Sequence, residues 1–192
     1  MTVLHFYFLG PLDIRSGNRQ LARPPTLKSQ SLLAYLVLHR DRPQPRERLT
    51  GLFWAERPEA KARRSLSTAL WHIRRCLNDG ANLLSDSHTV QLDPQSPIWL
   101  DVAAFEASVA AAGIASLQEA VALYRGDFLD GFYDEWIIDE RYRLESLFLE
   151  ALTQLMHSHE QAGAHQEALA TALRLLASDP LLEGEENQAL RR

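Results

Sequence analysis

Cysteine is nearly absent from this sequence, because Cys76 is the single one among 192 residues. A lone cysteine can form neither an internal disulfide nor a zinc site built from several cysteines. Long hydrophobic runs are missing too, since Leu32–Leu38 falls well short of the roughly 20 residues of a membrane-spanning helix. The first apolar stretch follows no basic segment of the kind that opens a signal peptide. We therefore expect a cytoplasmic protein without a membrane partner.

Signatures of catalysis are also missing. No GxxxxGK phosphate-binding motif occurs. Carboxylates are frequent between residues 134 and 140, but no nucleophile or histidine accompanies them, and acids at the start of a helix complement its dipole. His157 and His159 are two residues apart on a predicted helix, so their rings point in different directions. We expect a protein that is not an enzyme and uses no metal and no cofactor.

The net charge of −5 conceals an uneven distribution. Residues 1–100 carry a net charge of +6, and residues 101–192 carry −11. Between residues 46 and 75, eight bases stand against three acids. Such a local positive field attracts polyanions whatever the charge of the whole chain. A solvated helix face can have the same composition, so charge alone leaves both interpretations open.

The first half is predicted to combine short antiparallel strands with helices. Glycine-containing turns separate three short segments rich in strand-forming residues, and apolar residues then recur at helical spacing. Strands are expected at Val3–Leu9, Leu12–Arg15 and Arg19–Leu21, helices at Leu27–His39, Arg46–Phe53 and 61–77, and a hairpin at Leu83–Ser85 and Thr89–Leu92. Pro94 and Pro97 mark a boundary, so a first domain is predicted for residues 1–95.

The second half, residues 96–192, is predicted to be all-helical. Helices are expected at Val102–Ala112 with Asp101 as N-cap, from Ser116 to Tyr124, at 134–159 and at 165–177. Antiparallel helix pairs at this spacing indicate tetratricopeptide-like repeats of about 34 residues, although Met156 is larger than usual for its position. Residues 185–192 look like the opening of another helix. We therefore expect this domain to be truncated, and the chain to be the N-terminal part of a longer protein.

The predicted helix at 61–77 has two unlike faces. Leu66, Leu70, Ile73 and Leu77 form one apolar stripe, and no acid occurs between residues 60 and 78. The other side gathers bases, hydroxyls and one aromatic ring: Arg64, Ser67, Thr68, Trp71, Arg74 and Arg75, with Arg63 near its edge. Guanidinium groups bind guanine edges or phosphates, and hydroxyls can do either. The alternative is a basic helix that packs on an acidic partner.

The order of several motifs resembles that of SARP-type bacterial transcriptional activators. The motifs are Leu9-Gly10-Pro11-Leu12, Lys28-Ser29-Gln30-Ser31-Leu32-Leu33-Ala34, Arg48-Leu49 with Phe53-Trp54, and Arg63-Arg64-Ser65-Leu66 through Ile73-Arg74-Arg75-Cys76-Leu77. Phe128, Gly131, Phe132 and Glu135-Trp136, followed by Glu140-Arg141, resemble the start of that family's second module. The resemblance implies an α+β, OmpR-like winged helix followed by a helical bacterial transcriptional activator domain.

The resemblance also implies that the chain binds repeated sites in promoter DNA, as a homodimer if two copies occupy neighbouring repeats, and recruits RNA polymerase. A short positioning helix, a recognition helix and a hairpin wing are the parts of such a fold. The residues expected to contact double-stranded DNA are Arg63, Arg64, Ser67, Thr68, Trp71, Arg74 and Arg75 in the recognition helix, and Lys28, Arg46, Arg48 and His88 outside it. Further domains of the full-length chain are a second expected partner of the activator. The alternative function is a protein-interaction adaptor that uses its tetratricopeptide-like helices, and also its winged helix, for protein contacts. Steep salt dependence of DNA binding would separate the two.

Overall fold

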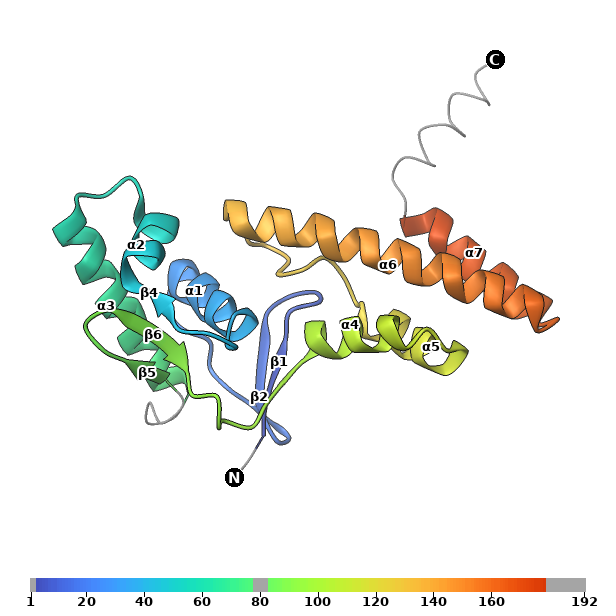
Figure 1. Ribbon diagram of the computed structural model, residues 1–192, viewed down its shortest axis with the longest axis horizontal. Coiled ribbons are helices and arrows are strands. Elements are labelled where there is room, and N and C mark those ends of the chain that lie inside the picture. Colours follow the sequence, from blue (N-terminus) through green and yellow to red (C-terminus); the bar gives the residue numbers. More distant parts are fainter. Residues whose placement is uncertain (1–2, 78–82, 179–192) are drawn as a thin grey trace, which may run out of the picture. The chain divides into compact units, whose positions relative to one another are not determined.

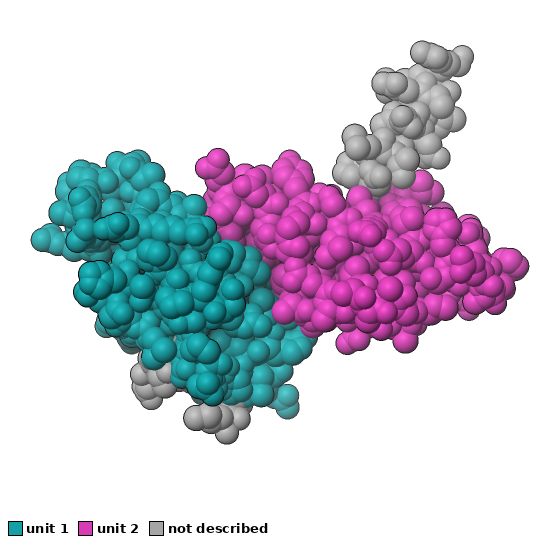
Figure 2. Space-filling view, in the orientation of Figure 1, with its two compact units in different colours: residues 1–8, 12–100 teal, residues 9–11, 101–192 magenta. Residues whose placement is uncertain are grey.

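The computed structural model describes residues 3–77 and 83–178. Its contacts divide the chain into two compact units, shown in teal and magenta in Figure 2. The first unit comprises residues 1–8 and 12–100, and the second comprises residues 9–11 and 101–192. The chain therefore passes from one unit to the other three times. The predicted helix start near residue 185 lies outside the described residues.

The first unit contains a four-stranded sheet with the strand order β3-β2-β1-β7. Its strands are β1 (Leu4–Tyr7), β2 (Asp13–Ser16), β3 (Arg19–Gln20) and β7 (Ile98–Leu100). Side chains alternate across it, so that Phe6 and Ile14 are fully buried while Tyr7 and Trp99 are half-buried on the other face. The antiparallel pairing of β1 with β2 confirms the predicted hairpin. Strand β7 was not predicted, and it runs parallel to β1.

Among its described residues, the first unit also contains three helices and a second, smaller sheet (Figure 1). The helices are α1 (Leu27–Leu38), α2 (Arg46–Trp54) and α3 (Glu59–Cys76). The second sheet has the order β4-β6-β5, with β4 at Gln44–Pro45, β5 at Leu83–Ser85 and β6 at Thr89–Leu92. All three helices and the β5–β6 hairpin lie within two residues of their predicted bounds. Helix α3 contacts both α1 and α2.

Helix α3 buries its apolar stripe as predicted. Leu66, Leu70 and Ile73 are at most 1% exposed, and Leu77 follows at 3%. Two alanines, Ala62 and Ala69, fill the space beside this stripe at 3% exposure each. Their small side chains allow close packing against the neighbouring helices. The rotation of α3 is thereby fixed, which determines the side chains it turns outward.

The described part of the second unit contains four helices that pack in chain order. They are α4 (Asp101–Ala111), α5 (Ile114–Leu123), α6 (Glu135–Gln161) and α7 (His165–Ser178), and α7 lies alongside α6 in Figure 1. Their core includes Phe105, Leu117 and Leu144, all fully buried, and the stacked rings of Tyr124 and Phe148, whose centroids are 4.1 Å apart. The predicted start of α5 at Ser116 is wrong, because the helix begins at Ile114 after Gly113. None of the helices that the structure describes is long and apolar enough to cross a membrane.

Residues 9–11 are held within the second unit by backbone hydrogen bonds. The Gly10 N–H donates to the carbonyl of Asp127 (3.0 Å), and the Asp130 N–H donates to the carbonyl of Gly10 (3.2 Å). Gly10 has a φ of +119°, a conformation that side chains disfavour. The fully buried Asp101 carboxylate accepts the N–H groups of Leu9 (2.9 Å) and Val102 (2.8 Å). Asp101 was predicted as an N-cap, but it is the first helical residue and joins α4 to this segment.

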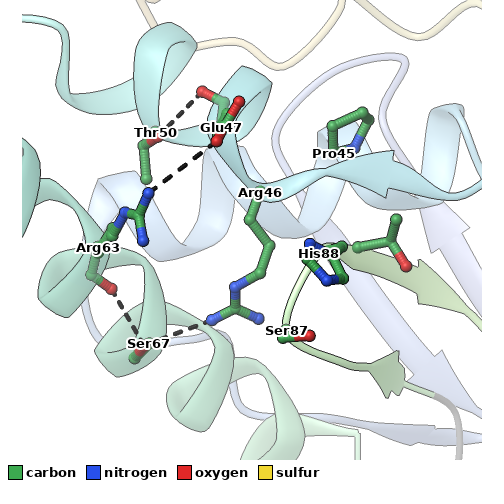
Figure 3. Close-up of a pocket in the computed structure, with 9 residues that line it drawn as sticks. Pro45, Arg46, Glu47, Thr50, Arg63, Ser67, Ser87 and His88 are labelled. Atoms are coloured by element: carbon green, nitrogen blue, oxygen red, sulfur yellow. Dashed lines mark hydrogen bonds and ion pairs between the residues drawn. The ribbon is translucent and has the colours of Figure 1, made fainter.

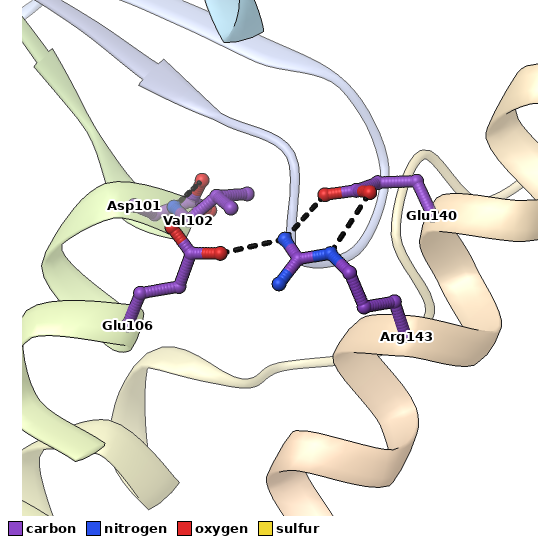
Figure 4. Close-up of polar contacts among 5 residues, drawn as sticks. All are labelled: Asp101, Val102, Glu106, Glu140 and Arg143. Atoms are coloured by element: carbon purple, nitrogen blue, oxygen red, sulfur yellow. Dashed lines mark hydrogen bonds and ion pairs between the residues drawn. The ribbon is translucent and has the colours of Figure 1, made fainter. Parts of the chain in front are cut away.

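A cluster of charged side chains joins α4 to α6 (Figure 4). The Arg143 guanidinium lies between the carboxylates of Glu140 and Glu106, at 2.5 and 2.6 Å from their nearest oxygens. Hydrogen bonds to Glu140, and to a smaller extent to Glu106, raise the pKa of Arg143 above its ordinary value. Arg141, two residues earlier and therefore on the opposite side of α6, instead donates to the main-chain carbonyls of Phe128, Leu129 and Phe132. These arginines therefore serve the packing of the helical unit.

Candidate nucleic-acid interface

The outward face of α3 carries the side chains that the sequence assigns to DNA. Arg64, Thr68, Trp71 and Arg75 are all exposed, on the side of the helix opposite Leu66 and Leu70. Trp71 is 51% exposed, and the Arg75 guanidinium lies over its ring at 4.8 Å from the centroid. Such a cation–π contact holds the guanidinium in one place without neutralising it. The face thus offers fixed positive charge beside a flat aromatic surface.

Ser67 and Arg63 lie along one edge of this face. The Arg63 guanidinium forms an ion pair with Glu59 at 2.6 Å and lies 4.0 Å from Glu47, so its charge is partly offset. Ser67 donates its hydroxyl hydrogen to the Arg63 carbonyl (3.0 Å), and Thr68 does the same to the Arg64 carbonyl (3.1 Å). Both hydroxyl oxygens can still accept. Arg74 is half-buried at the same edge.

A cleft of about 720 Å³ opens between α2, α3 and the turn of the β5–β6 hairpin (Figure 3). We call it the hairpin cleft. Four of the predicted DNA-contacting residues line it, and they come from three different elements: Arg46, Arg63, Ser67 and His88. The Arg46 guanidinium donates to Ser85 Oγ (2.9 Å), to the Asp86 carbonyl (3.3 Å) and to Ser67 Oγ (3.5 Å). Arg46 therefore bridges the hairpin and α3.

The hairpin turn is shaped by Asp86. Its carboxylate accepts the N–H groups of Thr89 (2.6 Å) and His88 (2.7 Å), and these hydrogen bonds lower the pKa of Asp86. The His88 carbonyl in turn accepts the N–H of Arg46 (2.8 Å), which pins the turn to the start of α2. His88 is left exposed at the rim of the cleft. The turn is therefore ordered by polar contacts on both of its sides.

On the other edge of α3 lies a second cleft of about 390 Å³, formed with the first turn of α1 and the turn after α2. We call it the α1 cleft. It gathers the predicted residues Lys28, Arg64 and Thr68, together with two residues that the sequence reasoning missed, Arg57 and His72. Arg57 could have been found, because it lies inside the basic stretch 46–75. The predicted Arg48 is exposed on α2 and lines neither cleft.

Cys76 is a packing residue. Its thiol lies 2.9 Å from the Ala22 carbonyl, to which it donates, and burial raises the pKa of the thiol to about 11. A thiol with so high a pKa is protonated, and hence unreactive, near neutral pH. No group of three or more metal-binding side chains occurs among residues 3–77 and 83–178. The outward face of α3 and the two clefts beside it instead present cationic and hydroxyl groups.

Comparisons with known proteins identify a family domain and two relatives. Residues 100–191 match the model of the bacterial transcriptional activator domain. The transcriptional regulatory proteins MoaR1 of Mycobacterium bovis BCG and of Mycobacterium tuberculosis are each 33% identical over 76 residues, which is 40% of this chain and 24% of theirs. Both relatives are thus named as regulators of transcription.

The fold is also similar to a solved structure, that of Mycobacterium tuberculosis EmbR in complex with a low-affinity phosphopeptide. The TM-score is 0.63 at 22% identity, over 100% of this chain and 66% of the EmbR chain. At this identity the likeness concerns the fold, which in both cases joins a sheet-containing N-terminal region to a helical C-terminal part. The chain spans less than two thirds of the length of each of these relatives.

Proposed function

We propose that this chain, which belongs to the SARP-type bacterial transcriptional activators, binds promoter DNA through its first unit. In this proposal the first unit is a winged helix, α3 is the recognition helix in the major groove, and the β5–β6 hairpin is the wing. The outward face of α3 carries the proposal. It combines Trp71, Arg64 and Arg75 in exposed positions with an apolar stripe that fixes the rotation of the helix.

Each element has a role in this arrangement. Arg64 and Arg75 would bind guanine edges or phosphates, and Trp71 would contact a thymine methyl group or a sugar. His88 at the hairpin turn is placed for an adjacent minor groove. Arg48 is available for a phosphate on the outer side of α2, where its side chain is exposed. Two copies bound on one side of the duplex would occupy repeats about 10–10.5 bp apart.

The second unit is proposed to contact RNA polymerase or further domains of the protein. Its net charge of −11 over residues 101–192 makes DNA an unfavourable partner and a basic protein surface a favourable one. Four helices that pack in chain order support a tetratricopeptide-like architecture, which binds protein partners. This role would appear as loss of transcription from a supercoiled promoter template when the second unit is altered while DNA binding persists.

The test of DNA binding uses duplexes selected by the protein from a random library. Arg64→Ala, Trp71→Ala and Arg75→Ala should each weaken binding to the selected duplex, and Arg42→Ala, an exposed arginine of the α1–β4 turn, should not. The logarithm of the affinity should fall linearly with the logarithm of the salt concentration, with a slope of about −0.9 for each phosphate contacted. Wild-type affinity in all three α3 variants would exclude this face from the interface.

The adaptor function makes the opposite prediction. Exposed leucines on α7, namely Leu169, Leu173 and Leu176, are 43–62% exposed and lie on one side of that helix, as in a protein-binding surface. If protein contacts were the only function, the library would yield no preferred duplex, and the salt slope would be shallow. A preferred duplex with a steep slope excludes that interpretation of the first unit.

A further inference from the structure

The α1 cleft lies on the opposite edge of α3 from the hairpin cleft. Ser67 faces the hairpin cleft, whereas Ser65 and His72 face the α1 cleft, with the outward face of α3 between them. Six of the lining residues matter for what the α1 cleft can bind: Lys28, Arg57, Arg64, Ser65, Thr68 and His72. Three of these are permanently cationic at neutral pH, and three more carry hydroxyl or imidazole groups. No acidic residue is among its described lining.

The cleft is organised before any ligand arrives. Arg57 Nη1 donates to Ser65 Oγ (2.9 Å), which fixes the guanidinium against α3. Below it, the buried Ser29 hydroxyl lies 3.2 Å from His72 Nδ1 and 2.7 Å from Thr26 Oγ, joining the first turn of α1 to α3. A binding site whose cations are already placed loses less conformational entropy on binding. Cations that are held in place before binding are typical of a binding site, whereas the cations of an ordinary solvated helix face are not held in this way.

The charge of Arg57 remains available. Among the described residues, Arg57 forms an ion pair with Glu56, whose Oε1 is 3.7 Å from Arg57 Nε, and both side chains are more than half exposed. An exposed ion pair of this kind contributes little and exchanges readily for a better partner. A phosphate offers such a partner, because its oxygens match the donors of a guanidinium in pairs.

From these observations we propose that the α1 cleft binds one phosphate group of the DNA backbone, on the strand across the major groove from the strand next to the hairpin. The inference rests on the proposed function, since it needs DNA along the outward face of α3. Arg57 and Lys28 bind the phosphate. Ser65 positions the Arg57 guanidinium, and His72 contacts Ser29 at the bottom of the cleft. The protein would thus contact the DNA phosphate backbone on both sides of the major groove that α3 enters.

The experiment scans the selected duplex with methylphosphonates, which replace one charged phosphate at a time by a neutral group. Wild-type protein should lose affinity at the phosphate held by the α1 cleft, and Arg57→Ala should be insensitive at that single position. Arg57→Ala and Lys28→Ala should each reduce the salt slope by about 0.9, equivalent to an affinity loss of about eightfold at 0.1 M salt. The loss should be equal on selected and random duplexes, because a phosphate carries no sequence information.

Arg42→Ala is the matched control, and it should keep the wild-type pattern of sensitive phosphates. Identical patterns in wild type and Arg57→Ala would overturn the inference while leaving the proposed function intact, whereas absence of a preferred duplex would remove both. Inorganic phosphate at constant ionic strength distinguishes the source of the ligand. It should not shift the NMR signals of His72, and a shift by inorganic phosphate without one by duplex DNA would assign the cleft to a free anion instead.

Discussion

Leu70 and Trp71 are neighbours in sequence with opposite surroundings, because consecutive residues of a helix are 100° apart. Leu70 is 1% exposed in the core of the first unit, and Trp71 is 51% exposed. Leu70→Ala should therefore lower the free energy of unfolding by about 2–5 kcal/mol, as a truncated buried leucine does. Trp71→Ala should change it by less than about 1 kcal/mol.

Urea denaturation, followed by circular dichroism, measures the free energy of unfolding of Leu70→Ala and Trp71→Ala. Comparable destabilisation by the two substitutions would mean that Trp71 is part of the core, and that its loss of DNA binding reports unfolding. The pair thus separates a surface role from a structural one at adjacent positions.

Arg46 was predicted to contact DNA, and its guanidinium is already engaged within the protein. Its bonds to Ser85 Oγ and Ser67 Oγ join the hairpin to α3. Arg46→Lys keeps the charge but loses the planar fork that reaches both partners. The backbone amides of the hairpin should then exchange with deuterium about 2- to 13-fold faster in the absence of DNA, the equivalent of 0.5–1.5 kcal/mol.

Arg48→Ala provides the control for this measurement, since Arg48 is exposed two residues further along the same helix. Its hairpin amides should exchange at the wild-type rate. Unchanged exchange in Arg46→Lys would show that the hairpin keeps its place without the guanidinium, and would return Arg46 to the group of direct DNA contacts.

At the scale of elements, alanine substitutions at two glycines should change stability in opposite directions. Gly51 lies inside α2 with helical geometry, and an added Cβ would meet nothing within 4 Å. Gly51→Ala should stabilise the first unit by about 0.4–1 kcal/mol, because alanine loses less entropy on folding. Gly163, between α6 and α7, has a φ of +73°, so Gly163→Ala should destabilise the second unit by about 1–2 kcal/mol.

Differential scanning calorimetry of the two glycine variants reports both changes as shifts of the melting temperature. The predicted shifts have opposite signs, upward for Gly51→Ala and downward for Gly163→Ala. A downward shift for Gly51→Ala would indicate that α2 lacks room for a side chain at that position.

Periodicity explains which elements were predictable. The spacing of Leu66, Leu70 and Ile73 identifies both the helix and its buried side, and the structure places α3 accordingly. Strand β7 was missed because Pro94 and Pro97 indicate a break in structure, and three residues are too few to show an alternating pattern. Its partner β1 is far away in sequence, and only tertiary pairing makes Ile98–Leu100 a strand.

Clefts were less predictable than faces. Apart from Arg74, which is half-buried, the sequence correctly indicated which residues α3 turns outward, since this follows from the rotation of one helix. Which residues share a cleft depends on contacts between elements. These contacts bring Arg46 and His88 together in the hairpin cleft, and Arg57 and His72 in the α1 cleft. Arg57 lies in a turn, where no periodicity indicates the direction of a side chain.

At the scale of the whole molecule, the Asp101 carboxylate connects segments that are 92 residues apart in sequence. Asp101→Ala would leave the buried N–H of Leu9 without its acceptor, which costs about 1–3 kcal/mol for such a group. The loss should appear in thermal unfolding and should be smaller in Asp101→Asn, whose side-chain carbonyl can still accept. Equal stability of Asp101→Ala and wild type would show that the N–H of Leu9 finds another acceptor.

The placement of residues 9–11 also bears on how such proteins can recombine. A gene fusion at residue 100 that exchanges one helical module for another would bring along Leu9, Gly10 and Pro11 from the old parent, and these residues pair with a segment near Asp127. The incoming helical module would have to form these backbone hydrogen bonds with three residues from a different protein. Swaps between regulators should therefore succeed most often when this short insert is transplanted together with the C-terminal module.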